Sequence, residues 1–375
     1  KAAVVITGGF AEVGNVKAEL ALKKLADEHD VALIGPNCMG VLNPAARVDS
    51  VFLPIYKMGR PHSGPVTYLF QSGAVGGCVV DMAARAGMGM SKFVSYGNAT
   101  VIDETDLLQY MSQDQTTGVV VSYLEGVRDG RRFMEAARAF TAQKPLVILK
   151  AGKTRLGAQA AASHTAAMAG SYEVYSAAFE QVGAVQADGL DELFDLAKIF
   201  ALPRSGGPRV AVVTNGGGNG VLAADAISEE GLSLAPFSPA TKKALAGLLP
   251  PYTNLRNPLD LIGDADAMRY EKALQLMIAD PNVDALVVIV LFQTASLDSS
   301  IVNVLAKAAA QGKPLVVVST GGEYTEMHRR ILDSSGVPTY SSPDTAVKAL
   351  AHFLHYNNYW CRYHPKEKMC ECRRP

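Results

Sequence analysis

The chain has 375 residues, of which 49% are hydrophobic, 19% charged and 7% aromatic. This composition is typical of a globular α/β protein with enough apolar residues for two or three domains. A formal net charge of −1 argues against a nucleic acid or an anionic membrane as partner, and no apolar run is long enough to span a bilayer. Five cysteines without an even framework fit a reducing cytoplasm.

The first predicted unit, residues 1–48, has two short apolar runs, 2–6 and 31–34, separated by a helical leucine pattern over 16–28. A single βαβ unit cannot bury both faces of a sheet, so we expect the later part of a Rossmann-like nucleotide-binding domain that begins before residue 1. Open α/β sheets bind ligands at the carboxyl ends of their strands. The residues at these two strand ends are Ile6, Thr7, Gly8, Gly9, Asn37 and Cys38. Cys38 is equally well explained as a small buried side chain.

A second domain, residues 64–202, is predicted after a Pro- and Gly-containing linker over 43–63. Apolar strands alternate with helices along it, which indicates a parallel sheet. Its first strand, 66–70, is followed by Ser72, Gly73 and Ala74 and then by a helix. The backbone N–H groups at such a helix start form a ready phosphate site.

The stretch from Lys144 to Gly183 contains a strand over 145–150, a long segment of small residues and a helix that starts after Ser171. We expect the small-residue segment to be a loop, with His164 at its centre. An imidazole in such a place could act as a nucleophile, titrate or bind a metal, or it could be an ordinary surface side chain.

A third domain, residues 207–356, starts with a strand over 209–214 and a glycine-rich turn. The candidate phosphate-binding residues of this turn are Asn215, Gly216, Gly217, Gly218 and Asn219. The sequence Lys-Pro-Leu-Val occurs at Lys144 and again at Lys313, so the second and third domains look like copies. We therefore expect an α/β fold with a partial Rossmann-like unit and two doubly wound, flavodoxin-like parallel sheets.

The tail, residues 357–375, contains Cys361, His364, Cys370 and Cys372. These side chains could bind zinc, but their spacing matches no common zinc finger. An ordinary, frayed terminus is the simpler expectation, and no metal site is predicted elsewhere.

The segment from Ser163 to Gly170, Ser-His-Thr-Ala-Ala-Met-Ala-Gly, resembles the phosphohistidine loop of the NDP-forming acyl-CoA synthetases. These are relatives of the α subunit of succinyl-CoA synthetase, and the resemblance extends over nearly the whole chain. It implies that His164 carries a phosphoryl group between a nucleotide site and an acyl site. It also implies that Glu125, after the strand over 119–124, orients the imidazole, although a loop carboxylate in water is the alternative for this residue.

The resemblance further implies that the turns at residues 6–9 and 37–38 bind CoA, and that the two glycine turns at Ser72 and Gly216 cradle the phosphate. In the succinate enzymes a tyrosine follows the Ser-Gly turn, whereas this chain has Gly77. The smaller residue predicts room for an acetyl, branched or aryl acid beside Gly77, Gly97 and Asn98.

No ATP-grasp pattern is recognisable in the sequence. The resemblance therefore implies that ATP or ADP and Mg²⁺ bind to a β subunit or a fused domain, within an oligomeric assembly. The expected reaction is acyl-CoA + NDP + phosphate ⇌ carboxylic acid + CoA + NTP. Two alternatives stay open: the CoA-sensing regulatory region of a protein lysine acetyltransferase, and a non-catalytic CoA-binding module.

Overall fold

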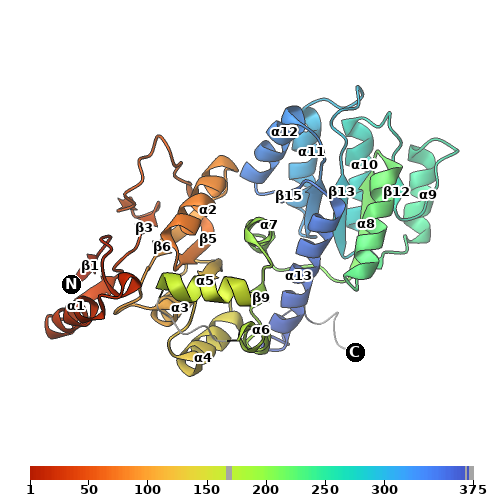
Figure 1. Ribbon diagram of the computed structural model, residues 1–375. Helices are drawn as coiled ribbons and strands as arrows, with labels where there is room; N and C mark the ends of the chain where they lie inside the picture. The colour runs from red at the N-terminus through yellow and green to blue at the C-terminus, as the bar shows by residue number, and fades with distance from the viewer. Residues whose placement is uncertain (166–170, 368–369, 371–375) are drawn as a thin grey trace. The chain divides into compact units, whose positions relative to one another are not determined.

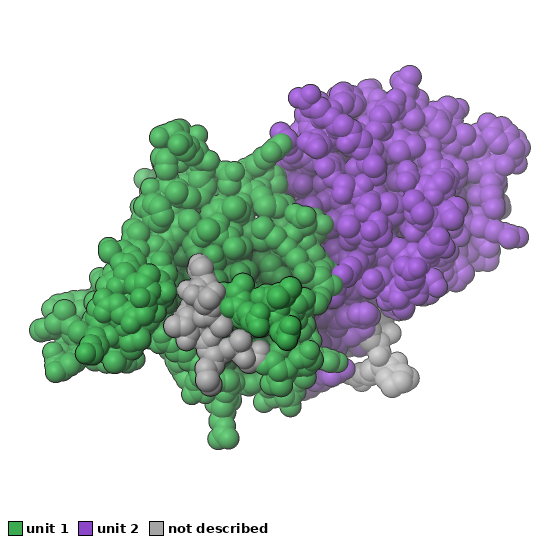
Figure 2. Space-filling model, viewed as in Figure 1, with its two compact units in different colours: residues 1–197 green, residues 198–375 purple. Residues whose placement is uncertain are grey.

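The computed structural model describes residues 1–165, 171–367 and 370, without the side chains of residues 161–165. The chain divides into two units, residues 1–197 and 198–375, which are coloured separately in Figure 2. The helices and strands of both are labelled in Figure 1.

Unit 1 begins with the predicted strand–helix–strand. Strand β1 (Ala2–Val4) pairs in parallel with β2 (Ala32–Ile34), and the short 3₁₀ helix η1 (Ala11–Val13) and α1 (Val16–Glu28) lie between them in the chain. This part of the sequence prediction is confirmed, with α1 at the expected residues.

The larger sheet of unit 1 has the strand order β4-β3-β6-β5-β7-β8-β9. The strands are β3 (Gly40–Asn43), β4 (Val48–Asp49), β5 (Ser63–Phe70), β6 (Met90–Ser95), β7 (Val119–Leu124), β8 (Leu146–Lys150) and β9 (Val185–Gln186). Strands β5 to β9 run parallel, whereas β3 pairs antiparallel with β6 and β4 with β3. Residues 40–49 thus extend this sheet, where the sequence predicted the end of the first unit and a linker. Two strands this short carry too little alternation to be recognised; β3 is held by pairing with β6, and β4 by pairing with β3.

The helices of unit 1 after α1 are α2 (Gly73–Arg85), α3 (Glu104–Gln113), α4 (Gly130–Thr141), α5 (Arg155–Thr165), α6 (Tyr172–Gln181) and α7 (Leu190–Phe200), the last of which continues into unit 2. Helix α5 corrects the expectation of a loop around His164. Its alanines, leucine, arginine and glutamine are good helix formers, and the Thr154 hydroxyl accepts the Gly157 N–H at 3.1 Å near the helix start.

Unit 2 contains one parallel sheet with the order β11-β10-β13-β14-β15, and β12 pairs with β10 in addition. Its strands are β10 (Arg209–Thr214), β11 (Ser233–Leu234), β12 (Leu259–Asp260), β13 (Ala285–Ile289), β14 (Leu315–Val318) and β15 (Thr339–Tyr340). Its helices are α8 (Gly217–Glu229), α9 (Pro239–Leu248), α10 (Ala267–Ala279), α11 (Ser300–Ala309), α12 (Glu323–Ser334) and α13 (Pro343–Cys361).

The two large sheets share one topology. In each, the second strand of the parallel set lies outside the first and the later strands follow on the other side, which is the flavodoxin-like order. The repeated lysines also have the same role. Lys144 Nζ donates to the Met111 and Asp114 carbonyls at the end of α3, and Lys313 Nζ donates to the Met277 and Asp280 carbonyls at the end of α10. The predicted pair of doubly wound sheets is confirmed, and each lysine stabilises a helix C-terminus.

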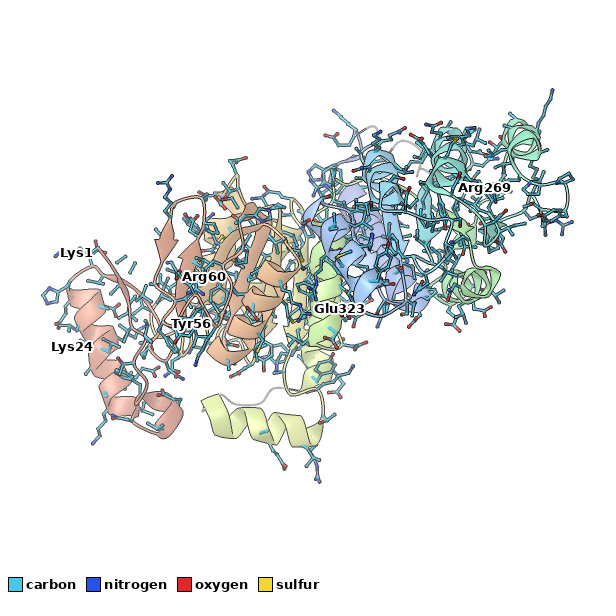
Figure 3. All side chains as sticks on the ribbon, turned by 90° about the horizontal axis from the view of Figure 1, so that it is seen from above. Lys1, Lys24, Tyr56, Arg60, Arg269 and Glu323 are labelled. Carbon is cyan, nitrogen blue, oxygen red and sulfur yellow. A yellow bond between two sulfur atoms is a disulfide. The ribbon has the colours of Figure 1, made fainter. Side chains whose placement is uncertain are left out.

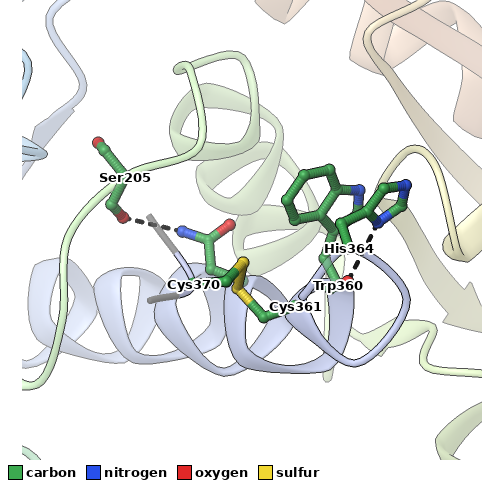
Figure 4. The surroundings of a disulfide bond; sticks show 6 residues. Ser205, Trp360, Cys361, His364 and Cys370 are labelled. Atoms are coloured by element: carbon green, nitrogen blue, oxygen red, sulfur yellow. Dashed lines mark hydrogen bonds between the residues drawn. A yellow bond between two sulfur atoms is a disulfide. The ribbon is translucent and has the colours of Figure 1, made fainter. Parts of the chain in front are cut away.

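The tail differs from both expectations for it. Cys361 and Cys370 form a disulfide, and the ring of Trp360 stacks on His364 with 3.9 Å between centroids (Figure 4). Cys372 lies outside the described residues. Within the described part of the chain, no group of three His, Cys, Asp or Glu side chains could hold a metal ion. No helix there is long and apolar enough to cross a membrane.

Candidate active site

A cavity of about 1370 Å³ in unit 1 lies where the carboxyl ends of several strands meet. It collects residues from each predicted set that falls in this unit. The predicted residues in its lining are Ile6, Asn37, Cys38, Ser72, Gly73, Ala74, Gly77, Gly97, Asn98 and Glu125. Thr7, Gly8 and Gly9 follow the same strand as Ile6 but are not among the lining residues.

The N-terminus of α2 points its first turn at this cavity. Ser72 is the N-cap, and its hydroxyl accepts the Val75 N–H at 3.4 Å. The backbone N–H groups of Gly73 and Ala74 have no carbonyl acceptor within the helix, and both residues line the cavity. Together with the positive end of the helix dipole they make a site suited to a phosphate or carboxylate.

The turns after β2 and β6 approach each other so closely that Gly97 is required. A Cβ at Gly97, which has φ +55°, would lie 2.2 Å from the Pro36 carbonyl oxygen and 2.3 Å from that of Asn37. The Asn98 N–H donates to the Pro36 oxygen at 3.0 Å. These contacts join the Rossmann-like part to the larger sheet at one edge of the cavity.

Asn98 links this edge to two carboxylates. Its Nδ2 donates to Glu12 Oε2 at 2.6 Å and to Glu19 Oε2 at 2.9 Å, and its Oδ1 accepts from Asn37 Nδ2 at 3.2 Å. Arg128 donates to the Glu19 carboxylate at 3.3 Å and to the Asn98 carbonyl at 2.7 Å. Since both amide hydrogens of Asn98 are used, its side chain positions the cavity edge, and only Oδ1 keeps capacity for a ligand.

Glu12 occupies the turn that the sequence predicted for CoA. Its Oε1 accepts the backbone N–H groups of Gly9 and Phe10. Burial alone would raise the pKa of Glu12, but the hydrogen bonds from Asn98 and these two N–H groups lower it below its ordinary 4.5. Sequence reasoning missed Glu12, Glu19 and Arg128; the available signal was Glu12, three positions after the Gly8-Gly9 turn.

Glu125 lies half-buried in the cavity wall. Its backbone N–H and that of Gly126 both donate to Gln71 Oε1, and Lys150 Nζ donates to the Glu125 carbonyl at 2.9 Å. Lys150 also lies 4.6 Å from the ring centroid of Tyr175. Burial lowers the pKa of Lys150, and the Glu125 charge partly opposes this. Gln71 and Lys150 therefore fix the backbone that presents the Glu125 carboxylate.

His164 lies in the last turn of α5, and α5 contacts η1, whose Ala11 lines the cavity. The His164 side chain and residues 166–170 lie outside the described part of the chain. The predicted approach of the imidazole to Glu125 therefore stays a prediction.

The glycine turn of unit 2 offers fewer ligands than predicted. Asn215 is buried, and its Oδ1 accepts the Leu291 N–H at 2.9 Å, so it fastens the turn to the end of β13. The Gly216 N–H donates to Thr214 Oγ1 at 2.9 Å. Gly217 and Gly218 begin α8 and are exposed, but a Cβ at Gly217 would lie 2.9 Å from Asp260 Oδ2. A carboxylate thus stands beside this helix N-terminus.

The predicted room beside Gly77 is bordered by Met39 and Leu53. A Cβ there would lie 2.9 Å from Met39 Cε and 3.4 Å from Leu53 Cδ1. The absence of a side chain on Gly77 is compensated by neighbours that the sequence could not place.

Comparison with known proteins defines the class. Residues 63–200 match the model of the succinyl-CoA ligase like flavodoxin domain, and residues 210–362 match that of the ligase-CoA domain. The chain is 40% identical to ADP-forming acetate–CoA ligase I of Archaeoglobus fulgidus, over 98% of this chain and 52% of the relative. It is 37% identical to the alpha subunit of ADP-forming acetate–CoA ligase II of Pyrococcus furiosus, over 93% of this chain and 77% of that subunit.

A solved structure agrees with these relatives. The dinucleotide-forming acetyl-coenzyme A synthetase 1 of Ca. Korarchaeum cryptofilum, in complex with phosphate and ADP, superposes with a TM-score of 0.89 at 34% identity, covering 98% of this chain and 79% of that one. The architecture is that of the acid–CoA ligases with succinyl-CoA-ligase-like domains. The chain belongs to the family of ADP-forming acyl-CoA ligases, which favours the ligase over the acetyltransferase-regulator alternative. It spans 52% of the Archaeoglobus fulgidus ligase, about half of that relative's length.

Proposed function

We propose that this chain is the CoA- and acyl-binding part of an ADP-forming acid–CoA ligase, which interconverts acyl-CoA, ADP and phosphate with a carboxylic acid, CoA and ATP. The observation that best supports this is the convergence of the predicted turns on a single cavity of about 1370 Å³. A strand-end turn from each of β1, β2, β5, β6 and β7 reaches it, and the α2 N-terminus supplies its anion-binding groups.

The residues of the cavity suit the acyl-transfer step. Phosphate attacks the thioester carbonyl, a C–O bond forms, and the C–S bond breaks to release CoA thiolate and acyl phosphate. The N–H groups of Gly73 and Ala74 stabilise the phosphate oxygens. A helix N-terminus contributes about 0.3–1 kcal/mol to such binding at an exposed site and up to about 2 kcal/mol when partly buried.

His164 carries the phosphoryl group onward. A neutral ring nitrogen attacks phosphorus, the P–O bond to the acyl group breaks, and the carboxylate leaves. Glu125 accepts a hydrogen bond from the other ring N–H, which fixes the tautomer and stabilises the phosphorylated, cationic ring. Gly217 and Gly218, the exposed first residues of α8, are the candidates for a second amide cluster in unit 2.

The nucleotide half of the reaction belongs to an ATP-grasp partner that holds ADP or ATP with Mg²⁺. Relatives of this chain include both a separate alpha subunit and a longer single chain, so the partner is a β subunit or a fused domain. Because its substrates include ATP and CoA, we expect the reaction to take place in the cytoplasm, and a β subunit would make the enzyme an oligomer.

Labelling with γ-³²P-ATP tests this function. The chain is incubated with Mg²⁺ and its ATP-grasp partner, and we expect acid-labile, base-stable label that mass spectrometry assigns to His164. His164→Asn should lose the label and still bind CoA, and Glu125→Gln should slow labelling. His62→Asn, which changes an exposed histidine of the same unit, is the matched control. Turnover without a phosphorylated His164 would refute the proposed carrier.

A further inference from the structure

Met39 lies along the first turns of α2, at the anion-binding end of the cavity. Gly73 and Gly77 are one helical turn apart and share a face. A Cβ at Gly73 would lie 3.2 Å from Met39 Cβ, and one at Gly77 would lie 2.9 Å from Met39 Cε. Met39 is 5% exposed, and its N–H donates to Ser95 Oγ at 2.9 Å. Its backbone is therefore fixed, and its thioether reaches along the helix from one glycine to the other.

Leu53, in the segment between β4 and β5, also lies next to Gly77. Its Cδ1 would lie 3.4 Å from a Cβ at Gly77. Arg60 holds the segment that carries it: Nη2 donates to the Leu53 carbonyl at 2.8 Å, Nη1 to the Met58 carbonyl at 2.8 Å, and Nε to Asp49 Oδ2 at 2.7 Å. Arg60 is labelled in Figure 3, as is Tyr56 of this segment. One guanidinium thus fixes Leu53 in place.

We propose that Met39 and Leu53 form a size gate that restricts the site to acids with a short acyl chain. Both line the cavity beside Gly73 and Ala74. This inference rests on the proposed function, in which those N–H groups bind the phosphate of the acyl phosphate. The acyl carbon of an acyl phosphate is joined to the phosphate through one oxygen, and Gly77 lines the same cavity one helical turn from Gly73, so the proposal places the first carbons of the acyl chain beside Gly77.

The two side chains of the gate differ in flexibility. Methionine is unbranched and flexible, so its terminal methyl adapts to a small acyl group. Leucine is branched and has fewer rotatable bonds, and Arg60 fixes the backbone of Leu53, so this side chain adapts less. A branched or aryl acid would have to displace both side chains, whereas an acetyl group would not.

Calorimetry with acetyl-CoA and phenylacetyl-CoA on the full chain tests the gate. Met39→Ala should improve the affinity for phenylacetyl-CoA relative to acetyl-CoA by about tenfold or more, the range that a few methylenes in an apolar pocket produce. Gly77→Ala should shift the ratio the other way, because the new methyl pushes on the flexible end of Met39. It also replaces glycine by a better helix former, so folding is retained.

Met88→Ala is the matched control. Met88 is 7% exposed in the same unit, does not line the cavity and supplies none of the three atoms nearest to a Cβ at Gly77. Its acyl preference should equal that of the wild type, with any loss of stability measured separately. If CoA binds but Met39→Ala and Gly77→Ala leave the ratio unchanged, the gate is refuted and the proposed function stands. If the wild type binds neither CoA nor either thioester, the proposed function fails and the gate with it.

Discussion

Glu104 makes the stability of unit 1 depend on pH, and replacing it by glutamine should remove that dependence. The side chain is 3% exposed at the first turn of α3, and within the described residues its Oε1 has no hydrogen-bond partner. Burial, with a further contribution from the Asp103 charge, raises the pKa of Glu104 from 4.5 to about 7. Arg128 and Arg132 oppose this rise but do not cancel it.

The sign follows from proton binding. Between pH 4.5 and 7 the folded protein holds a proton on Glu104 that the unfolded chain has lost, so stability falls as pH rises through this window. At 1.36 kcal/mol per pH unit between the two pKa values, the loss reaches about 3 kcal/mol above pH 7. Glutamine resembles the protonated acid at every pH. Glu104→Gln should therefore match the wild type near pH 4 and exceed it by about 3 kcal/mol at pH 8.

Hydrogen exchange measures this in unit 1 alone. Peptides from β5 and β7 report its global opening across pH 4 to 8, with rates corrected for intrinsic exchange. Trp360, the single tryptophan, lies in unit 2, so its fluorescence transition in urea reports on that unit separately. Glu135→Gln, at an exposed site on α4, is the matched control. Equal pH dependence of stability in Glu104→Gln and wild type would show that burial does not raise the pKa of Glu104.

Three further substitutions test other contacts. Ser72→Ala should destabilise α2 by about 1 kcal/mol and weaken phosphate binding, while Ser72→Thr keeps the cap; thermal melts and calorimetry compare them. Asn98→Asp should cost about 1–3 kcal/mol at pH 7, because it places a third carboxylate beside Glu12; a loss unchanged at pH 4 would contradict this. Despite its partial burial, Asp114 has a lowered pKa because Lys92 donates to it at 2.6 Å, so Lys92→Met should cost about 3 kcal/mol at pH 7. That difference should narrow as urea titrations move below pH 3.8, where the pair's contribution is progressively lost.

Most of the fold could be predicted from the sequence because most strands and helices are marked by local patterns of apolar and turn residues. Strand β7 and helix α1 have the expected bounds, since each is an apolar run or stripe between clear turn residues. Helix α5 was missed because its alanines carry no apolar periodicity, although they favour a helix. Strand β3 was missed because it pairs with β6, a partner some fifty residues away in the chain, and β4 was missed with it because it pairs only with β3.

The candidate site could likewise be predicted only in part. The strand-end turns could be predicted, since parallel strands bring their carboxyl ends to one edge. The contacts between them could not. Asn98 meets Glu12 across 86 residues and Arg128 meets Glu19 across 109, and no local pattern encodes such distances. For the same reason the sequence suggested open space at Gly77, where Met39 and Leu53 lie.

The turn after β1 already contains an anion of its own. The Glu12 carboxylate accepts hydrogen bonds from the backbone N–H groups of Gly9 and Phe10. A phosphate that binds these N–H groups would therefore have to displace the carboxylate. The released carboxylate would stay tethered within reach and compete for return. The affinity of this turn for phosphate would then depend on how much more strongly phosphate binds than the Glu12 carboxylate. With a neutral residue at position 12, phosphate would bind without displacing another anion.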